Sequence, residues 1–129
     1  MCMTEVELKT QLRSRSICVV IPTYNNEKTI KTVVEKTLCY CADVIVVADG
    51  CTDNTLKILR GIPQITIISY PKNKGKGYAL KAGFKTALAK GFSYAITLDG
   101  DGQHYPEDIQ LFLRANQQYP HSLIIGSRQ

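Results

Sequence analysis

The sequence has no apolar stretch that approaches the roughly 18 to 20 residues needed to cross a bilayer. Its start, MCMTEVELK, is acidic and lacks the basic-then-apolar order of a secretory signal. Low-complexity segments and internal repeats are absent, and glycine and proline are not in excess, which excludes disordered and solenoid chains. We therefore expect a globular domain in the cytoplasm, or at the cytoplasmic face of a membrane in a full-length protein.

The cysteine pattern lacks the spacing of a disulfide framework or a zinc knuckle. The five cysteines are odd in number and include no C-x-x-C pair, so we expect reduced and partly buried thiols. A chain of 129 residues is one domain by size and buries roughly two thirds of its unfolded surface. The net charge of +5 indicates an anionic partner, such as a nucleotide phosphate or a membrane surface.

Continuous apolar runs alternate with helical patterns along the chain. The runs are ICVVI from residue 17, DVIVVA from 43, ITIIS from 65, SYAITL from 93 and SLIIG from 122. Continuous runs rich in valine and isoleucine are typical of strands buried on both faces, and helices between them require parallel strands with right-handed crossovers. The pattern predicts an α/β fold, Rossmann-like, with three α/β/α layers, a mainly parallel sheet of order 3-2-1-4 and the fifth run beside or near the fourth strand.

The domain is expected to cover residues 17–129, with residues 1–16 as a leader that is either a short amphipathic helix or frayed. The loops that follow the first four runs, PTYNN, DGCTDNT, YPKNKGKG and DGDGQH, are polar and turn-prone. The connections at the opposite edge carry little chemistry. Because ligands of such sheets bind beyond the carboxyl ends of the strands, we expect the functional site at that edge.

The stretch LDGDGQH places Asp99 and Asp101 directly after the fourth run. Two neighbouring carboxylates repel each other, and a divalent cation with oxygen ligands relieves that repulsion; Gln103 offers a further oxygen. Gly100 allows the chain to fold tightly around such an ion. The alternative is a solvated Asp-Gly turn. His104 is within reach of the proposed metal but fits a hydrogen-bonding role better.

The other loops supply candidate contacts for a nucleotide. Asp49 ends the second strand and could accept a hydrogen bond from a ribose or a base, or serve the fold alone. Lys76, between two glycines at a helix start, is the best phosphate candidate of its loop. Tyr24 could flank a flat base or pack under its loop. We expect helices to start at Asn25 or Asn26 and, with Thr52 or Asp53 as N-cap, after the second strand.

Five strand-end pieces together resemble the family 2 glycosyltransferases with the GT-A fold, and among them the polyprenyl-phosphate sugar transferases. The pieces are CVVIPTYNNEKTI, VIVVADGCTDNT, NKGKGYALKAG, LDGDGQHYPEDI and IIGSR, which occur in order over residues 17–128. The resemblance implies a nucleotide-diphosphate sugar as donor and a lipid-phosphate or glycan acceptor, with no nucleic acid. It leaves room for a homo-oligomer and for membrane association through a further C-terminal region.

The resemblance also implies a role for individual residues. Asp99, Asp101 and Gln103 would hold Mg²⁺ or Mn²⁺ against the donor pyrophosphate. The nucleoside site would be lined by Pro22, Tyr24, Val47 and Asp49, while Gly100 would touch the donor through its backbone and Arg128 would meet phosphate. Two positions depart from the family pattern: Asn26 stands where the family often has glutamate, and Ala48 precedes Asp49 where paired acids are usual.

Family members of this type continue past the GSR strand into an acceptor-binding half, so we expect this chain to supply the donor and metal site, and we name no catalytic base. Two alternatives differ in class. One is a nucleotide-binding fragment without catalysis. The other is a phosphatase of the haloacid dehalogenase type, in which the first aspartate of D-x-D is the nucleophile; the motif normally opens such a domain, whereas here few residues follow it.

Overall fold

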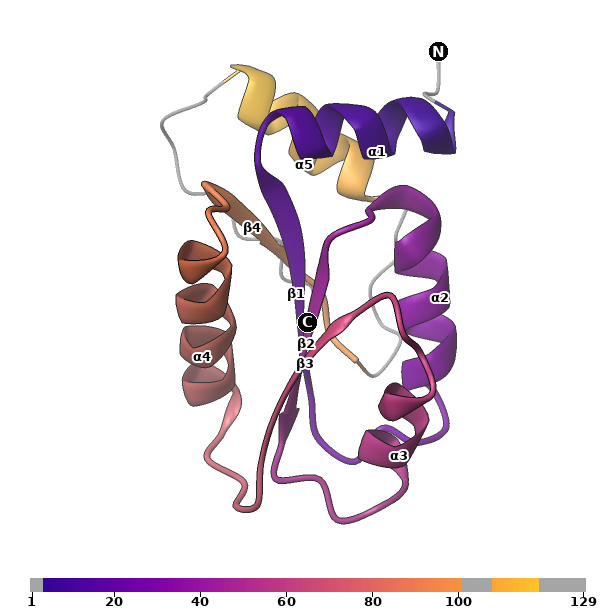
Figure 1. Ribbon diagram of the computed structural model, residues 1–129, viewed down its shortest axis with the longest axis vertical. Helices are drawn as coiled ribbons and strands as arrows, with labels where there is room; N and C mark the ends of the chain where they lie inside the picture. The colour runs from indigo at the N-terminus through magenta and orange to yellow at the C-terminus, as the bar shows by residue number, and fades with distance from the viewer. Residues whose placement is uncertain (1–3, 101–107, 119–129) are drawn as a thin grey trace.

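The computed structural model describes residues 4–100 and 108–118 (Figure 1). In this part of the chain the elements alternate as the sequence predicts. They are α1 (Glu5–Ser14), β1 (Ile17–Thr23), α2 (Ile30–Tyr40), β2 (Val44–Asp49), α3 (Thr55–Arg60), β3 (Thr66–Tyr70), α4 (Lys76–Ala89), β4 (Tyr94–Thr97) and α5 (Asp108–Gln118). Four of the five predicted strands therefore form, and the fifth run, 122–126, lies outside the described residues.

The four strands are parallel and ordered β3-β2-β1-β4, which confirms the predicted order. β1 and β2 are buried at every position. They occupy the middle of the sheet with helices over both faces, which is why their sequences are apolar without alternation. The chain moves outward from β1 to β3 and then returns to the other side of β1, so the strand order reverses between β1 and β4.

The helices form two layers around the sheet. Among the described elements, α4 alone covers one face, and α1, α2, α3 and α5 lie on the other (Figure 1). The buried side chains divide in the same way, into a large cluster beneath the four helices and a small one beneath α4. The predicted three-layer α/β/α architecture is confirmed.

Residues 5–14 form a helix, the first of the two alternatives for the leader. The side chain of Thr4 accepts a hydrogen bond from the Glu7 backbone N–H and caps α1. Leu8 and Leu12, one turn apart, are buried in the large cluster, whereas Val6 is exposed. The leader is therefore packed against the domain and contributes to its core.

One predicted helix start is wrong by several residues, and the other lies within about one residue of its prediction. α2 begins at Ile30 and not at Asn25 or Asn26, because a turn comes first in which the Asn26 carbonyl accepts from the Thr29 and Ile30 N–H groups. α3 begins at Thr55, with Asn54 in the N-cap position, and the predicted Asp53 supplies the capping side chain, because its Oδ1 accepts from the Thr55 N–H at 2.9 Å. The turn at Asn26 displaces the start of α2, and propensity alone does not show its hydrogen bonds.

The close approach of α4 to the sheet fixes the position of its first turn. A Cβ at Gly83 would lie 2.4 Å from Cγ1 of Val20 and 3.3 Å from Cγ2 of Val47. Only glycine allows the helix to pack this near the two central strands. The first turn of α4 is thereby held at the carboxyl edge of the sheet, close to the ends of β1, β2 and β4.

Candidate functional site

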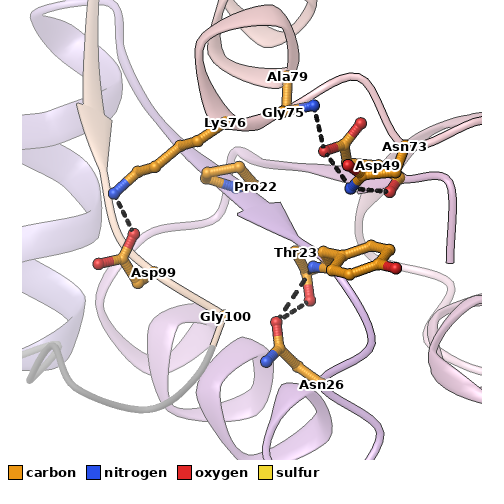
Figure 2. Close-up of a pocket in the computed structure, with 11 residues that line it drawn as sticks. Pro22, Thr23, Asn26, Asp49, Asn73, Gly75, Lys76, Ala79, Asp99 and Gly100 are labelled. Carbon is orange, nitrogen blue, oxygen red and sulfur yellow. Dashed lines mark hydrogen bonds and ion pairs between the residues drawn. The ribbon is translucent and has the colours of Figure 1, made fainter.

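A cavity of about 340 Å³ opens at the carboxyl edge of the sheet, on the side of α4 (Figure 2). Four loops contribute to its wall. The lining residues are Pro22, Thr23, Tyr24, Asn26, Asp49, Asn73, Gly75, Lys76, Ala79, Asp99 and Gly100. Three predicted segments, the loops after β1 and β2 and the start of α4, therefore meet the end of β4 in one place.

The cavity lies where the strand order reverses, as expected for ligand sites in open parallel sheets. Pairing between β1 and β4 ends at Val20 and Thr97, whereas β1 and β2 stay paired as far as Thr23 and Ala48. Pro22 lies beyond the last β4 pair, where its missing N–H leaves no ladder bond unmade on that side. β1 and β4 therefore separate there, and the chain after β4 forms the opposite wall.

An ion pair spans the cavity. The Lys76 ammonium lies 2.8 Å from Oδ1 of Asp99, and Figure 2 shows the two side chains reaching toward each other. The Asp99 side chain is only 18% exposed, and that of Lys76 is 53% exposed. A mostly buried carboxylate requires a cationic or hydrogen-bonding partner, and the lysine supplies one from the first residue of α4.

Asp49 is almost completely buried, and backbone donors surround its carboxylate. Oδ1 accepts from the Lys74 N–H at 2.8 Å, and Oδ2 accepts from the Gly75 N–H at 3.0 Å. The Asn73 side-chain amide donates to Oδ2 at 2.9 Å and to the Asp49 carbonyl at 3.2 Å. Asp49 thus anchors the chain leading into α4, whose N-cap, Gly75, has no side chain to do so.

The surroundings of Asp49 are tightly packed. A Cβ at Gly50, whose φ is +64°, would lie 2.1 Å from the Asn73 nitrogen, so this turn requires glycine. Burial, with the nearby Asp49 carboxylate as a further cause, raises the pKa of Tyr70 well above its usual value. The Tyr70 hydroxyl oxygen is buried without a hydrogen bond of good geometry. Tyr70 therefore stays protonated beside the anion.

The loop after β1 is held against the chain that follows β4. Oδ1 of Asn26 accepts from the Thr23 hydroxyl at 2.6 Å and from the Tyr24 N–H at 3.2 Å. The Thr29 hydroxyl donates to the Gly100 carbonyl at 2.8 Å. A Cβ on Gly100 would lie 2.7 Å from the Thr23 hydroxyl oxygen. The residue after Asp99 must therefore be small, and its backbone forms the cavity wall.

A reciprocal set of hydrogen bonds joins the loop after β1 to the loop after β2. Oδ1 of Asn25, a residue with φ of +51°, accepts from the N–H groups of Thr52 and Asp53. Oε2 of Glu27 accepts from the Asn54 N–H, and Oδ2 of Asp53 accepts from the Glu27 N–H. Although burial opposes it, hydrogen bonding from Thr55 and Glu27 leaves the pKa of Asp53 below its usual value. Glu27 thus has a structural role one position after the family's glutamate.

Most of the described site predictions fall on the cavity wall. Pro22, Asp49, Lys76, Asp99 and Gly100 line it, and so does Tyr24, whose side chain is half-exposed and does not pack beneath the loop.

Val47 is the exception, because its side chain is fully buried under α4 and does not line the cavity. Asp101, Gln103, His104 and Arg128 lie outside the described residues.

Sequence reasoning gave no site role to five wall residues, Thr23, Asn26, Asn73, Gly75 and Ala79. Asn73 binds a residue 24 positions earlier, and no local spacing indicates such a partner. Ala79 is buried in the first full turn of α4, and its periodicity resembles that of any core alanine. Thr23 ends a buried strand, and that position was the only available signal.

The donor set at the end of β4 suits a hard divalent cation. Asp99 supplies a mostly buried carboxylate oxygen at the cavity wall, and in this structure the Lys76 ammonium occupies the position of a cation beside it. An oxygen ligand so placed fits Mg²⁺ or Mn²⁺. The remaining predicted ligands, Asp101 and Gln103, follow within the next four positions of the sequence.

Comparison with known families agrees with this geometry. Residues 18–129 match the family described as glycosyl transferase family 2. The chain therefore belongs to glycosyl transferase family 2, and the phosphatase alternative is set aside. The family resemblance inferred from the five strand-end pieces is confirmed.

Two curated relatives have names that specify a lipid-phosphate substrate or product. UDP-N-acetylglucosamine–dolichyl-phosphate N-acetylglucosaminyltransferase of Methanococcus voltae is 33% identical over 134 residues, which cover 91% of this chain and 53% of the relative. Polyprenol monophosphomannose synthase of Mycolicibacterium smegmatis is 32% identical, over 85% of this chain and 44% of the relative. The chain thus spans about half the length of the curated relatives it matches.

Solved structures share the fold. Glucosyl-3-phosphoglycerate synthase from Mycobacterium tuberculosis, crystallised with Mn²⁺, uridine diphosphate and glucosyl-3-phosphoglycerate, has a TM-score of 0.61 and 27% identity over 85% of this chain and 42% of that one. A mycobacterial protein of 24% identity has a TM-score of 0.65, with coverage of 88% and 42%. The described helices include none that is both long and apolar enough to cross a membrane.

Proposed function

We propose that this chain binds a nucleoside-diphosphate sugar together with Mn²⁺ or Mg²⁺, and that it forms the donor half of a transferase that glycosylates a polyprenyl phosphate or a related glycan acceptor. The observation that carries the proposal is the convergence of Asp99, Lys76 and the start of α4 on one cavity. One relative is named for transfer to dolichyl phosphate, and one neighbour was crystallised with Mn²⁺ and uridine diphosphate.

The diphosphate of the donor belongs at the end of the cavity formed by Asp99 and α4. Gly75 and Lys76 present the N-terminus of a 14-residue helix there, and such a terminus favours anions. A carboxylate and a diphosphate cannot lie together without a cation between them. The metal, when bound, neutralises both and stabilises the departing nucleoside diphosphate. Asp101, Gln103 and Arg128 are proposed to assist as ligands and as a phosphate contact.

The nucleoside belongs at the other end of the cavity, beside the loop after β1. The Tyr24 ring is half-exposed at the cavity wall and offers a flat face to a base. Pro22 contributes an apolar surface beside it. The hydrogen bonds that Asn25 and Glu27 accept from the loop after β2 hold this end rigid, so little ordering is left for the ligand to impose.

The transfer step joins an oxygen of the acceptor phosphate to the anomeric carbon of the sugar, while the bond from that carbon to the diphosphate breaks. The electron pair leaves with the nucleoside diphosphate. An acceptor that is already an anion at neutral pH needs no general base. The described wall residues all suit the donor, so a donor-binding domain without transfer is the second candidate function.

Titration of the 129-residue chain with uridine and guanosine diphosphates, in Mn²⁺ and in chelator, tests donor binding. We expect binding only with metal, and an affinity at least several-fold lower in Asp99→Asn, which loses a charged ligand to a hard cation. Glu35→Gln, which removes an exposed carboxylate of α2 on the opposite side of the sheet, is the matched control. Equal affinity with and without chelator would refute the proposal.

The same samples, given a nucleotide sugar and a polyprenyl phosphate, separate the two candidate functions. Labelled sugar that enters the lipid phase identifies a transferase. Metal-dependent donor binding without labelled lipid identifies a donor-binding domain.

A further inference from the structure

Residues 54–98 contain no aspartate or glutamate, although they make up about a third of the chain. The same stretch holds eight of the sixteen lysines and arginines. They are Lys57, Arg60, Lys72, Lys74, Lys76, Lys81, Lys85 and Lys90. All the acidic residues lie before or after this stretch. The chain therefore carries a strongly positive region, although its net charge is modest.

Six of these lysines lie on α4 or beside its ends. Tyr78, Lys81, Lys85 and Leu88 are exposed and follow one another at intervals of three, four and three residues, which places them on one side of the helix. Ala79, Gly83 and Ala87, on the opposite side, are buried against the sheet. Lys74, whose ammonium lies over the Tyr78 ring, extends this outer surface at the start of the helix. We call it the α4 face.

The α4 face has no partner in the described part of the chain. α4 is the single described helix on its side of the sheet (Figure 1), and its main contacts are with β1, β2 and β4. Lys81 and Lys85 make no ion pair with any described residue. Lys74 lies 4.7 Å from the centre of the Tyr78 ring. Positive charge of this density attracts an anionic surface.

Apolar groups accompany the charge. Leu88 is 75% exposed and Tyr78 is 47% exposed. Beside Leu88, a hollow of about 270 Å³ is lined by Phe84, Phe92, Tyr94 and neighbouring residues. Nucleic acid would use the lysines and leave exposed aliphatic groups in water. A lipid surface uses both, because lysines meet anionic headgroups while leucine and aromatic rings enter the boundary with the acyl chains.

We propose that the α4 face docks on the surface of an anionic lipid bilayer. The proposal goes beyond the donor site, and vesicle binding can be measured without nucleotide or metal, so its failure is distinguishable from failure of the proposed function. The two are linked in space, because the first turn of α4 also lines the donor cavity. A chain docked in this way keeps that cavity close to the headgroup layer, where a lipid-phosphate acceptor resides.

The test is co-sedimentation of the 129-residue chain with vesicles of phosphatidylcholine alone and with vesicles containing one third phosphatidylglycerol. We expect binding to the anionic vesicles that weakens as salt rises, because exposed charges are screened. The triple variant Lys74→Gln, Lys81→Gln, Lys85→Gln should bind at least tenfold less, since each lysine near such a surface contributes several-fold.

A matched triple variant removes the same charge from the other side of the sheet. Lys28→Gln, Lys31→Gln and Lys36→Gln alter exposed lysines on α2 or just before it, and vesicle binding should change less than about threefold. Leu88→Ser, with unchanged charge, should weaken binding to anionic vesicles several-fold. Circular dichroism confirms that each variant is folded.

Three results would overturn the proposal. The first is an equal loss of vesicle binding in both triple variants, which would show that binding depends only on net charge. The second is equal binding to neutral and anionic vesicles. The third is tighter binding to duplex or single-stranded nucleic acid than to vesicles, with no effect of Leu88→Ser, which would assign the α4 face to a nucleic acid.

Discussion

The ammonium of Lys76 lies 2.8 Å from Oδ1 of Asp99, so the first residue of α4 neutralises the carboxylate that ends the β4 segment. The two residues come from segments 23 positions apart in the sequence and from opposite walls of the cavity (Figure 2). A divalent cation bound by Asp99 would compete with the ammonium. A diphosphate bound beside that cation would give the displaced lysine a new anionic partner.

Replacement of Lys76 by methionine is expected to change the affinities for Mn²⁺ and for nucleoside diphosphate in opposite directions. Mn²⁺ alone should bind several-fold more tightly, because no ammonium competes for Asp99. Nucleoside diphosphate in the presence of saturating Mn²⁺ should bind several-fold more weakly, because the phosphates lose a cation. Electron paramagnetic resonance of free Mn²⁺ measures the first affinity and calorimetry the second. If both affinities fall together, Lys76 does not exchange partners.

Replacement of Gly83 by alanine is expected to destabilise the fold. The new Cβ would lie 2.4 Å from Cγ1 of Val20, and overpacking of this kind costs about 1–3 kcal/mol, more than the roughly 1 kcal/mol gained in helix propensity. Gly77→Ala on the same helix has no atom within 4 Å of its Cβ and should be neutral or stabilising. Urea unfolding measures both, and equal stabilities would contradict the close packing of α4.

Much of the architecture could be predicted because the buried strands appear in the sequence as uninterrupted apolar runs. The run ICVVI became β1, and the placement of Asp49 and Asp99 at one edge followed from the parallel connections. Contacts between loops could not be predicted. The bonds from Asp49 to Lys74 and Gly75 join residues 25 and 26 positions apart, and no periodicity indicates them.

The burial of Val47 could not be predicted from the sequence either. Its position at the end of an apolar run fits both a cavity wall and a core, and the choice depends on how closely α4 approaches the sheet. The approach is set by Gly83, a residue 36 positions later in the sequence. Because one glycine sets the distance between α4 and the sheet, the strand ends alone do not show which residues line the cavity.

The buried cysteines are expected to be unreactive at neutral pH. Burial raises the pKa of Cys18 to about 12 and that of Cys41 to about 11, from a usual value of 9.0. An alkylating reagent at pH 8 should modify Cys39, which is exposed, and spare Cys18 and Cys41 until the protein unfolds. Peptide mass spectrometry identifies the modified sites, and rapid labelling of Cys18 in the folded chain would contradict its burial.

The same shifts make the fold less stable at alkaline pH. Between pH 9 and the folded-state pKa, Cys18 and Cys41 keep their protons in the folded state but lose them when unfolded. The unfolded state therefore binds fewer protons, and the free energy of unfolding falls as pH rises, by at most about 1.4 kcal/mol per pH unit for each thiol. The double variant Cys18→Val, Cys41→Val should show a smaller dependence in urea unfolding between pH 8 and 10.5, whereas Cys39→Val should keep all of it.

Asp49→Asn distinguishes an anchor from a ligand contact. The carboxylate accepts from the Lys74 and Gly75 N–H groups and from the Asn73 amide. In the variant an NH₂ group replaces one oxygen and faces the N–H donors. The side chain also loses its negative charge. We expect a loss of about 1–3 kcal/mol in stability and faster hydrogen exchange at the Lys74 and Gly75 amides.

Nucleotide affinity should fall in Asp49→Asn as well, because Gly75 and Lys76 line the cavity and the loosened loop must be ordered again on binding. Asn73→Ala keeps the carboxylate but removes one of its donors. It should therefore lose less stability than Asp49→Asn, and its loss of nucleotide affinity should be smaller to the same degree. A direct contact between Asp49 and the ligand predicts another pattern. If Asp49→Asn kept the stability and the amide protection of the parent chain while nucleotide affinity collapsed, the carboxylate would act on the ligand directly, and its bonds to the α4 loop would be secondary.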